Sequence, residues 1–398
     1  MKIGIVWKDD YPWDVRIEKM ANALRDHGHN VHILARNRRR ESVMESFDGF
    51  TVHRMCPLSN SRLNNIVSLP IGFNPMWYHF IRRVSKLQSL DALIVRDLPL
   101  MPAGILAGRR LGIPVIFDMA ENYPALWREV ASDQRYNLFN FVLKNPTLGA
   151  RLESLCVKLA DRVLVVVEES RDRLLAMGVP EGKVAIVSNT PSVEQISKFA
   201  GGVEQVTDQW RDRRVLIYQG YVNRARGLQA IVRALPGLVG EYRDLLLVVV
   251  GTGNDIENLK CLARELSVEA HTSFMGWVDH NVIPAMVLSS TAGLIPHSDT
   301  EHKRTTVPNK LFDYMACAKP VIVSSVPPLK RIVEAERCGV VFQAGDEASF
   351  ARAVRHLLDN AELARDMGRR GEEAVRARYN WQYDAQVLAE VVGTVVRG

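Results

Sequence analysis

Residues 305–324 read Thr-Thr-Val-Pro-Asn-Lys-Leu-Phe-Asp-Tyr-Met-Ala-Cys-Ala-Lys-Pro-Val-Ile-Val-Ser, which predicts a helix followed directly by a buried strand. Pro308 is favoured in a first helical turn. The helix N-terminus offers unpaired N–H groups and a positive dipole end to a phosphate, and Lys310 adds a charge. Asp313, about one turn further on, can accept hydrogen bonds from ribose hydroxyls. The same residues also fit an ordinary capped helix with an incidental lysine and aspartate.

On both sides of this stretch, apolar runs of strand length alternate with segments of helical spacing, which predicts a doubly wound α/β domain over residues 213–379. An amphipathic helix is expected after it, from Trp381 to about Val396. The expected strands are Val215–Tyr218, Leu245–Val250, Thr272–Met275, Ala292–Ile295, Val321–Val323 and Val340–Phe342.

The first half of the chain shows the same alternation and predicts a second doubly wound α/β domain over residues 1–190. The weak, polar pattern of residues 191–212 predicts a linker between the two domains. Two such domains in tandem present the carboxyl ends of two sheets, where ligands bind. The expected strands are Lys2–Trp7, Val31–Ala35, Ala92–Val95, Val115–Phe117, Val163–Val167 and Val184–Val187.

The composition is that of a globular protein: 47% of the 398 residues are hydrophobic and 24% are charged. No apolar run approaches the ~20 residues of a membrane-spanning helix. Lys8, Asp9 and Asp10 follow the N-terminal apolar run too early for a signal peptide. The five cysteines are widely spaced and odd in number, which favours a reducing compartment. The predicted location is therefore the cytoplasm.

The net charge of +6 equals the basic excess of one segment, residues 30–90, which holds nine Lys/Arg and three Asp/Glu residues. Within it, residues 63–87 combine aromatic and apolar side chains with the pair Arg82-Arg83. This pattern fits an interfacial membrane segment on the inner face of the plasma membrane. It fits equally well a core helix with a basic, solvated edge. An anionic membrane surface is thus one candidate partner.

Several common motifs are absent from the sequence. The loop after the first strand, Lys8–Asp14, has no glycine, so it lacks the G-x-G-x-x-G of a dinucleotide-binding domain. There is no Walker motif, no D-x-D pair of the kind that holds a divalent metal, and no His/Cys cluster with zinc spacing. The sequence therefore predicts no metal and no separate cofactor.

Two glycine-rich loops follow expected strands of the second domain. Gly220–Gly227 contains Arg224 and Arg226, and Gly251-Thr252-Gly253 follows Leu245–Val250. Glycines let the backbone approach a ligand closely, and arginines neutralise phosphates. Arginines in an exposed loop are, however, often only solvated.

Taken together, the chain resembles retaining family-4 glycosyltransferases of the GT-B fold. The resemblance spans nearly the whole chain and rests on the helix-strand stretch above, both glycine-rich loops, Phe274–Val278, Gly28–Val31, Ala160–Val163 and the final helix. It implies two Rossmann-like domains facing across a cleft, with the final helix crossing back onto the first domain. It also implies that a nucleotide-sugar donor binds mainly to the second domain.

The resemblance implies a role for individual donor-site residues. Arg226 falls where a basic residue holds the diphosphate, and Asp313 at the second acid of the E-x7-E motif, which binds ribose. Thr305 replaces the first acid, and Thr305 or Thr306 is then expected to bind sugar or phosphate. The full expected donor site is Gly220, Arg224, Arg226, Gly251, Gly253, Trp277, Val278, Thr305, Thr306, Asn309, Lys310 and Asp313.

In the first domain, Asp118 and Glu121 follow the strand Val115–Phe117. The resemblance places a histidine or an acid here, facing the reacting sugar, so Glu121 and Asp118 are the catalytic candidates; a carboxylate after a strand is also commonly a helix cap. Asp14 and Arg16 lie where acceptor and donor phosphates would approach. The other interpretation is a helix N-cap followed by a solvated arginine.

The sequence therefore predicts a retaining, metal-independent glycosyltransferase. It would move a sugar from a nucleotide diphosphate sugar to a glycan or lipid-linked acceptor in polysaccharide or glycoconjugate biosynthesis. Arg226 and Lys310 would stabilise the leaving diphosphate in place of a metal. One alternative is a nucleotide-sugar 2-epimerase of the same fold. Another is a basic protein that binds membranes or nucleic acid without catalysis, although no nucleic-acid-binding motif is present and nucleic acid is not an expected partner.

Overall fold

The computed structural model describes residues 1–12, 14–60, 64, 69, 73–131, 144–192, 210, 212–279 and 281–397. The chain forms two compact units. The first domain comprises Met1–Asn189 together with Gln382–Gly398, and the second comprises Thr190–Trp381. Most of the linker predicted over residues 191–212 lies outside the described residues.

The first domain contains an eight-stranded sheet in the order β3-β4-β2-β1-β5-β6-β7-β8. All neighbouring strands are parallel except β3 and β4. The strands are β1 (Lys2–Asp10), β2 (Asn30–Arg36), β3 (Met44–Phe47), β4 (Phe50–Arg54), β5 (Ala92–Arg96), β6 (Val115–Met119), β7 (Arg162–Val165) and β8 (Val184–Ile186).

The hairpin of β3 and β4 was not among the expected strands. Its turn is Asp48-Gly49, and both residues have positive φ, 49° and 82°. Asp-Gly is the preferred pair for a two-residue hairpin because both central residues of a type I′ turn need positive φ. The residues of β3 are mostly exposed, so the strand has no apolar run from which it could have been predicted. The first sheet is therefore mixed, with one antiparallel strand at its edge.

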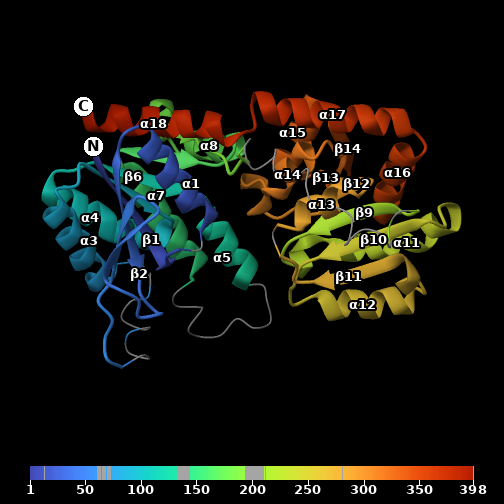
Figure 1. The fold of residues 1–398 in the computed structure, drawn as a ribbon, viewed down its shortest axis with the longest axis horizontal. Helices are drawn as coiled ribbons and strands as arrows, with labels where there is room; N and C mark the ends of the chain where they lie inside the picture. Colours follow the sequence, from blue (N-terminus) through green and yellow to red (C-terminus); the bar gives the residue numbers. More distant parts are fainter. Residues whose placement is uncertain are drawn as a thin grey trace. The chain divides into compact units, whose positions relative to one another are not determined.

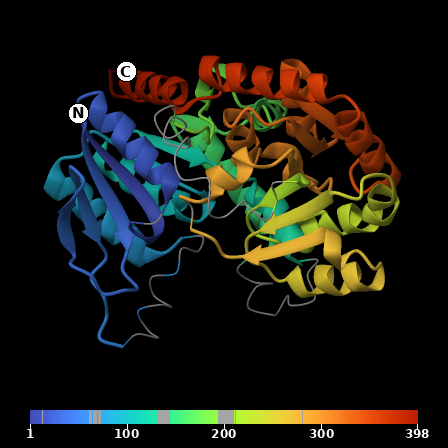
Figure 2. The same ribbon diagram turned by 45° about the vertical axis from the view of Figure 1, so that its right-hand side comes forward.

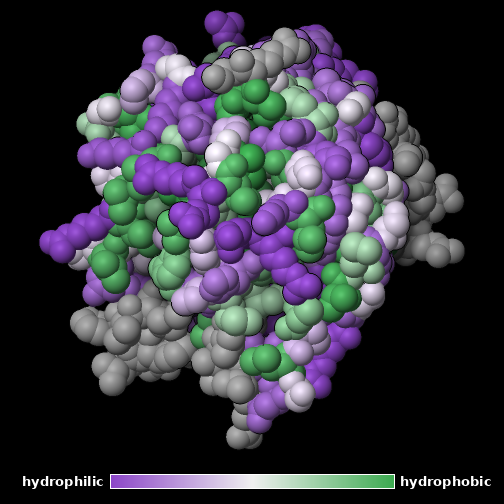
Figure 3. Space-filling view, turned by 90° about the vertical axis from the view of Figure 1, so that its left-hand side faces the viewer, coloured by the Kyte–Doolittle hydropathy of each residue, from purple (hydrophilic) through white to green (hydrophobic). Residues whose placement is uncertain are grey.

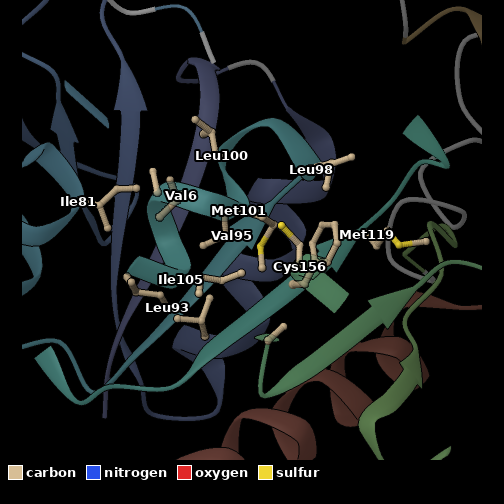
Figure 4. Close-up of a cluster of buried hydrophobic side chains, with 14 of the residues drawn as sticks. Val6, Ile81, Leu93, Val95, Leu98, Leu100, Met101, Ile105, Met119 and Cys156 are labelled. Atoms are coloured by element: carbon tan, nitrogen blue, oxygen red, sulfur yellow. The ribbon is translucent and has the colours of Figure 1, made fainter. Parts of the chain in front are cut away.

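Helices cover the first sheet (Figure 1). The apolar side chains of α3, α4 and α7 meet those of β1, β5 and β6 in one buried cluster, part of which Figure 4 shows. The helices of this domain are α1 (Val15–Asp26), α3 (Pro75–Gln88), α4 (Met101–Leu111), α5 (Tyr123–Ala131), α7 (Pro146–Leu159) and α8 (Glu168–Ala176), with short 3-10 turns η1 (Leu98–Leu100) and η2 (Glu181–Lys183).

The final helix, α18 (Trp381–Arg397), packs on the first domain although it follows the second in sequence. Leu388 and Val392 are fully buried. The Oδ1 atom of buried Asp384 accepts a hydrogen bond from the backbone N–H of Ser188 at 2.9 Å. Among the described residues, no helix combines the length and the apolar character needed to cross a bilayer.

The second domain contains a six-stranded sheet in the order β11-β10-β9-β12-β13-β14. Every neighbouring pair is parallel. The strands coincide with the six expected ones, give or take a residue at the ends. They are β9 (Arg214–Gln219), β10 (Leu245–Val250), β11 (Thr272–Gly276), β12 (Ala292–Ile295), β13 (Val321–Ser324) and β14 (Gly339–Phe342).

Helices flank the second sheet too, and Figure 2 shows them from a second angle. Its core joins β9, β10 and β12 to α11, α12 and α16. The helices are α11 (Leu228–Glu241), α12 (Ile256–Glu265), α13 (Ile283–Leu288), α14 (Lys310–Ala316), α15 (Pro327–Glu336), α16 (Glu347–Leu358) and α17 (Ala361–Ala377), with 3-10 turns η4 (Arg224–Arg226), η5 (Glu269–His271) and η6 (Lys303–Thr305).

Candidate functional site

The candidate site lies in the second domain, where the strand order of the sheet reverses direction. β9 lies between β10 on one side and β12 on the other. The chain therefore continues from β9 to β10 in one direction along the strand order, and from β12 to β13 in the other. The loops after β9 and β12 diverge at the carboxyl edge of the sheet. In open parallel sheets, ligands bind at this topological switch point.

Arg226 comes from the loop that follows β9. It lies in the turn η4, and its Nη1 atom is 3.0 Å from Nε2 of His297, which follows β12. Its Nε atom is buried and has no hydrogen-bond partner in the part of the chain that the structure describes. The guanidinium is thus held at one nitrogen and keeps unused donors at others.

Close backbone packing holds this loop in place. A Cβ atom at Gly227, whose φ is 72°, would lie 1.9 Å from the carbonyl oxygen of Pro296. A Cβ atom at Gly253 would lie 1.7 Å from the carbonyl oxygen of Val222. Both distances are far inside van der Waals contact, so no side chain fits at either position. These glycines are needed for loop-to-loop packing.

Lys310 and Asp313 come from α14, and a tyrosine fixes that helix on the sheet. The ring of Tyr314 occupies the space where Gly293 of β12 lacks a side chain. Its hydroxyl donates to the carbonyl of Ile217 at 3.3 Å and accepts from the backbone N–H of Gln219 at 3.1 Å. The side chain of Gln219 in turn donates to Oδ2 of Asp313 at 3.0 Å. Asp313 is therefore anchored to the end of β9.

The ammonium group of Lys310 lies over the ring of Tyr218, 3.8 Å from its centroid. It also lies next to Gly220, whose missing side chain leaves room for it. Burial and the nearby charge of Arg226 hold the pKa of Lys310 well below its usual range, and Asp313 opposes this shift only in part. An anion bound beside Arg226 and Lys310 would offset the repulsion between these two cations. The site thus holds more positive than negative charge, with Lys303 as a third cation and Asp313 as the carboxylate.

The other residues predicted for the donor site lie around this centre with different exposures. Thr305 is buried, and its hydroxyl donates to the carbonyl of His302 at 3.0 Å, so it faces its own turn. Thr306 is half-buried. Asn309 is exposed and precedes α14, which begins two residues later than Pro308 suggests. Arg224 is exposed as well.

The loop after β11 carries an unusually exposed aromatic ring. Trp277 is 75% exposed, the largest fraction among the exposed large hydrophobic side chains of the described residues. It follows Gly276, whose carbonyl accepts from the backbone N–H of Gly251 at 2.7 Å. Gly251 has φ of 135°, and Val278 is half-buried. The tryptophan therefore lies on a loop that is tied to the glycine-rich loop after β10.

In the first domain, Arg16 and Asp118 bind each other. Asp118 is fully buried and accepts from Nη2 and Nε of Arg16 at 2.6 and 2.9 Å. Nη1 of Arg16 donates to the carbonyls of Val187 and Ser188 and to Oδ1 of Asn189. Both side chains are thereby committed to contacts within the domain.

The two remaining first-domain candidates lie nearer the surface. Asp14 caps α1 by accepting from the backbone N–H of Ile17 at 2.9 Å, and it also pairs with Arg96. Glu121 is half-buried after β6. Its negative charge contributes to raising the pKa of the buried Asp97 carboxyl, for which burial is the main cause.

His297, Gln219 and Tyr314 were not among the predicted site residues. All three are buried: His297 contacts Arg226, Gln219 donates to Asp313, and Tyr314 anchors the helix that carries Lys310 and Asp313. A weak signal exists for all three, because each lies at the end of a strand or next to a predicted site residue. Their roles depend on contacts between residues 71 to 95 positions apart in sequence, which the spacing of residues along the chain does not reveal.

Two sequence families match the chain. Residues 14–190 match the glycosyl transferase 4-like domain, and residues 205–374 match the glycosyl transferases group 1. The chain is 32% identical over 183 residues to the phosphatidyl-myo-inositol mannosyltransferase of Mycobacterium leprae, covering 46% of this chain and 47% of that protein. It is 24% identical over 214 residues to a glycogen synthase of Mycobacterium tuberculosis, covering 52% and 50%. The chain thus spans about half the length of these curated relatives.

Solved structures resemble the whole chain. Sucrose-phosphate synthase from Thermosynechococcus elongatus aligns with a TM-score of 0.80 at 16% identity, covering 100% of this chain and 99% of that one. HepE of Anabaena in complex with UDP aligns with a TM-score of 0.72 at 13% identity, covering 99% and 100%. At these identities the likeness establishes the fold, which is GT-B. With two Rossmann-like domains that each match a glycosyltransferase family, the chain belongs to the group 1, family-4-like glycosyltransferases.

Proposed function

We propose that the protein transfers a sugar, with retention of configuration, from a nucleotide diphosphate sugar to a glycan or lipid-linked acceptor in glycoconjugate or polysaccharide biosynthesis. The observation that carries the proposal is the cation-rich centre at the switch point of the second sheet, where Lys310 lies over Tyr218 and the buried Nε of Arg226 has no hydrogen-bond partner among the described residues. Such a centre suits a diphosphate. HepE of Anabaena, a protein with the same fold, forms a complex with UDP, which supports a nucleotide donor.

The proposed chemistry is electrostatic. As the bond to the sugar breaks, negative charge grows on the leaving diphosphate, and Arg226 and Lys310 stabilise it. The leaving phosphate accepts the proton of the acceptor hydroxyl, which attacks from the same face, so no protein nucleophile is required. Asp313 binds the ribose, and the exposed Trp277 and half-buried Val278 pack against the base. In the first domain, Glu121 is the preferred candidate to face the sugar, because Asp118 is already paired with Arg16.

The diphosphate contact is tested by alanine variants. Arg226→Ala and Lys310→Ala are each expected to weaken binding of a nucleoside diphosphate by about 10- to 100-fold, because each removes a charge-assisted hydrogen bond. Calorimetric titration of UDP, GDP, ADP and dTDP measures the effect. Arg233→Ala is the matched control, since Arg233 is an exposed arginine of α11 paired with Glu347 at 3.7 Å. Unchanged affinities in both site variants would refute this donor site.

We propose metal independence because the sequence has no D-x-D pair and the charges of Arg226 and Lys310 would take the place of a metal. Transfer activity is therefore expected to persist in EDTA. The measurement is release of nucleoside diphosphate in the presence of a cell-derived glycolipid extract, with and without chelator. A strict requirement for Mg²⁺ or Mn²⁺ would show that the cationic centre does not suffice.

Chromatography of the nucleotide sugar after incubation without an acceptor separates transfer from epimerisation, because epimerisation changes the sugar and leaves the nucleoside diphosphate attached. A nucleotide-sugar 2-epimerase acts on the donor alone, whereas a transferase needs an acceptor for product formation. An epimeric nucleotide sugar formed from the donor without any acceptor would favour the epimerase. The family matches favour transfer.

We further propose that the first domain docks on an anionic lipid surface through α3. Its exposed residues combine apolar and basic side chains, namely Met76, Arg83, Lys86 and Leu87. Figure 3 shows the side of the molecule that lies to the left in Figure 1, where apolar side chains are scattered among polar ones. A mixed surface of this kind suits the interface between lipid headgroups and acyl chains.

Vesicle sedimentation tests this docking. The protein is expected to sediment with vesicles of phosphatidylglycerol and phosphatidylcholine but not with phosphatidylcholine alone. Arg83→Gln with Lys86→Gln should weaken binding about 30-fold, because each charge near the surface contributes about 1 kcal/mol. Arg352→Gln with Arg365→Gln, two exposed arginines of the second domain, is the charge-matched control. Equal sedimentation with both vesicle types would refute the docking.

A further inference from the structure

The buried histidine after β12, His297, contacts Arg226 of the proposed donor site, and the proposed function so far assigns this histidine no role. His297 is 2% exposed. Its Nε2 atom lies 3.0 Å from Nη1 of Arg226. A guanidinium can only donate hydrogen bonds, so Nε2 must accept and cannot carry a proton. The contact therefore requires a neutral imidazole with its proton on Nδ1.

The surroundings of His297 keep the imidazole neutral. Cationic groups face it from three elements: Arg226 from η4, Lys310 from α14, and Lys303, beside His302, from η6. Burial, first, and then these charges hold its pKa well below the usual value. A positive charge on the His297 imidazole would be repelled by all three cations. Nε2 therefore remains an acceptor throughout the neutral pH range.

The backbones of the two partners are fixed relative to each other. The backbone N–H of Ser298 donates to the carbonyl of Ala225 at 3.1 Å. Gly227 passes so close to Pro296 that a side chain would collide with its carbonyl. The loops after β9 and β12 are thus joined on both sides of the pair. The position of the guanidinium is therefore set by the imidazole and the packed loops.

We propose that His297 is a positioning residue of the donor site: as a neutral hydrogen-bond acceptor, it holds the Arg226 guanidinium so that the remaining N–H groups meet the diphosphate. The proposal rests on the proposed function. An acceptor that carries no charge orients the arginine without neutralising it. A carboxylate in the same place would orient it too, but would cancel the charge that the diphosphate needs.

The experiment compares two side chains of similar shape. His297→Gln keeps a neutral acceptor, and His297→Met has at most a weak one. By calorimetry with UDP, GDP, ADP and dTDP, the glutamine variant is expected to bind within about 3-fold of the unmodified protein and the methionine variant about 10-fold more weakly. In an Arg226→Ala background the two variants should bind equally, because the histidine acts through the arginine. Thermal unfolding checks that both are folded.

A pH series supplies a second readout. Glutamine does not titrate, so the ratio of affinities between the unmodified protein and His297→Gln is expected to stay constant from pH 8 to pH 6. If this ratio falls as the pH is lowered from 8 to 6, His297 becomes protonated in that range and the proposal is overturned. His271→Met is the control, since His271 bonds to the carbonyl of Leu245 at the opposite end of the sheet.

The outcomes separate the two proposals. If the unmodified protein binds none of the four nucleotides, the proposed function fails and the role of His297 fails with it. If it binds one of them, and the methionine variant binds equally well or the glutamine variant is as weak as the methionine variant, only the role of His297 is refuted. A difference between the two variants that persists without Arg226 would also refute it.

Discussion

Replacing Arg16 with leucine is expected to lower the free energy of unfolding of the first domain by about 3–5 kcal/mol, because the change leaves the Asp118 carboxylate buried without a counter-charge. Asp118 has no exposed surface, and Arg16 is 4% exposed. The arginine also donates to the carbonyl of Val187 at 3.0 Å and to Asn189 at 2.7 Å. The substitution therefore disconnects α1 from the end of β6 and from the segment after β8.

Urea unfolding, followed by calorimetric separation of the two domain transitions, measures this loss. The double variant Arg16→Leu with Asp118→Leu should regain most of the stability, because no unpaired charge remains. Arg171→Leu is the control, as Arg171 pairs with Asp172 at the surface and should change stability by less than about 1 kcal/mol. A loss below about 1 kcal/mol for Arg16→Leu would mean that water reaches Asp118.

The first domain is expected to lose stability as the pH falls from about 6.5 to about 4, by about 2 kcal/mol at pH 5 and about 3 kcal/mol at pH 4. The cause is His32, which is buried against His53 with Nδ1 and Nε2 3.1 Å apart. Burial, with a smaller contribution from the neighbouring His53, lowers the pKa of His32 to about 4. The unfolded chain binds its proton at about 6.5, so between these values acid favours unfolding.

Urea unfolding at pH 7.5, 6.5, 5 and 4 measures this dependence. The double variant His32→Leu with His53→Leu is expected to lose that part of the pH slope, because it has no imidazole to protonate at this site. His79→Gln is the matched control, since His79 is an exposed histidine of α3. Identical slopes in the unmodified protein and the leucine double variant would contradict the assignment.

The pairing of Arg16 with Asp118 shows why the sequence left two interpretations open for the charged residues at these strand ends. The residue types of Asp14, Arg16 and Asp118 suit phosphate approach or catalysis, and their positions at strand ends support that interpretation. In the folded domain Asp14 caps α1 and Arg16 binds Asp118. Whether a charged side chain meets a ligand or a protein partner depends on a residue 102 positions away, which local pattern does not show.

The sequence by itself determined where most strands and helices lie, because buried parallel strands are short apolar runs and the helices between them have a clear period. All six strands of the second domain lie where those runs predicted them. The hairpin of β3 and β4 is the exception, since an exposed edge strand has no apolar run, although Asp48-Gly49 was a usable signal. Tertiary structure alone decided which side chains meet at the carboxyl edge. Tyr314 anchors α14 and His297 holds Arg226 because strand order makes β9 and β12 neighbours, and strand order is a property of the folded sheet rather than of any single segment.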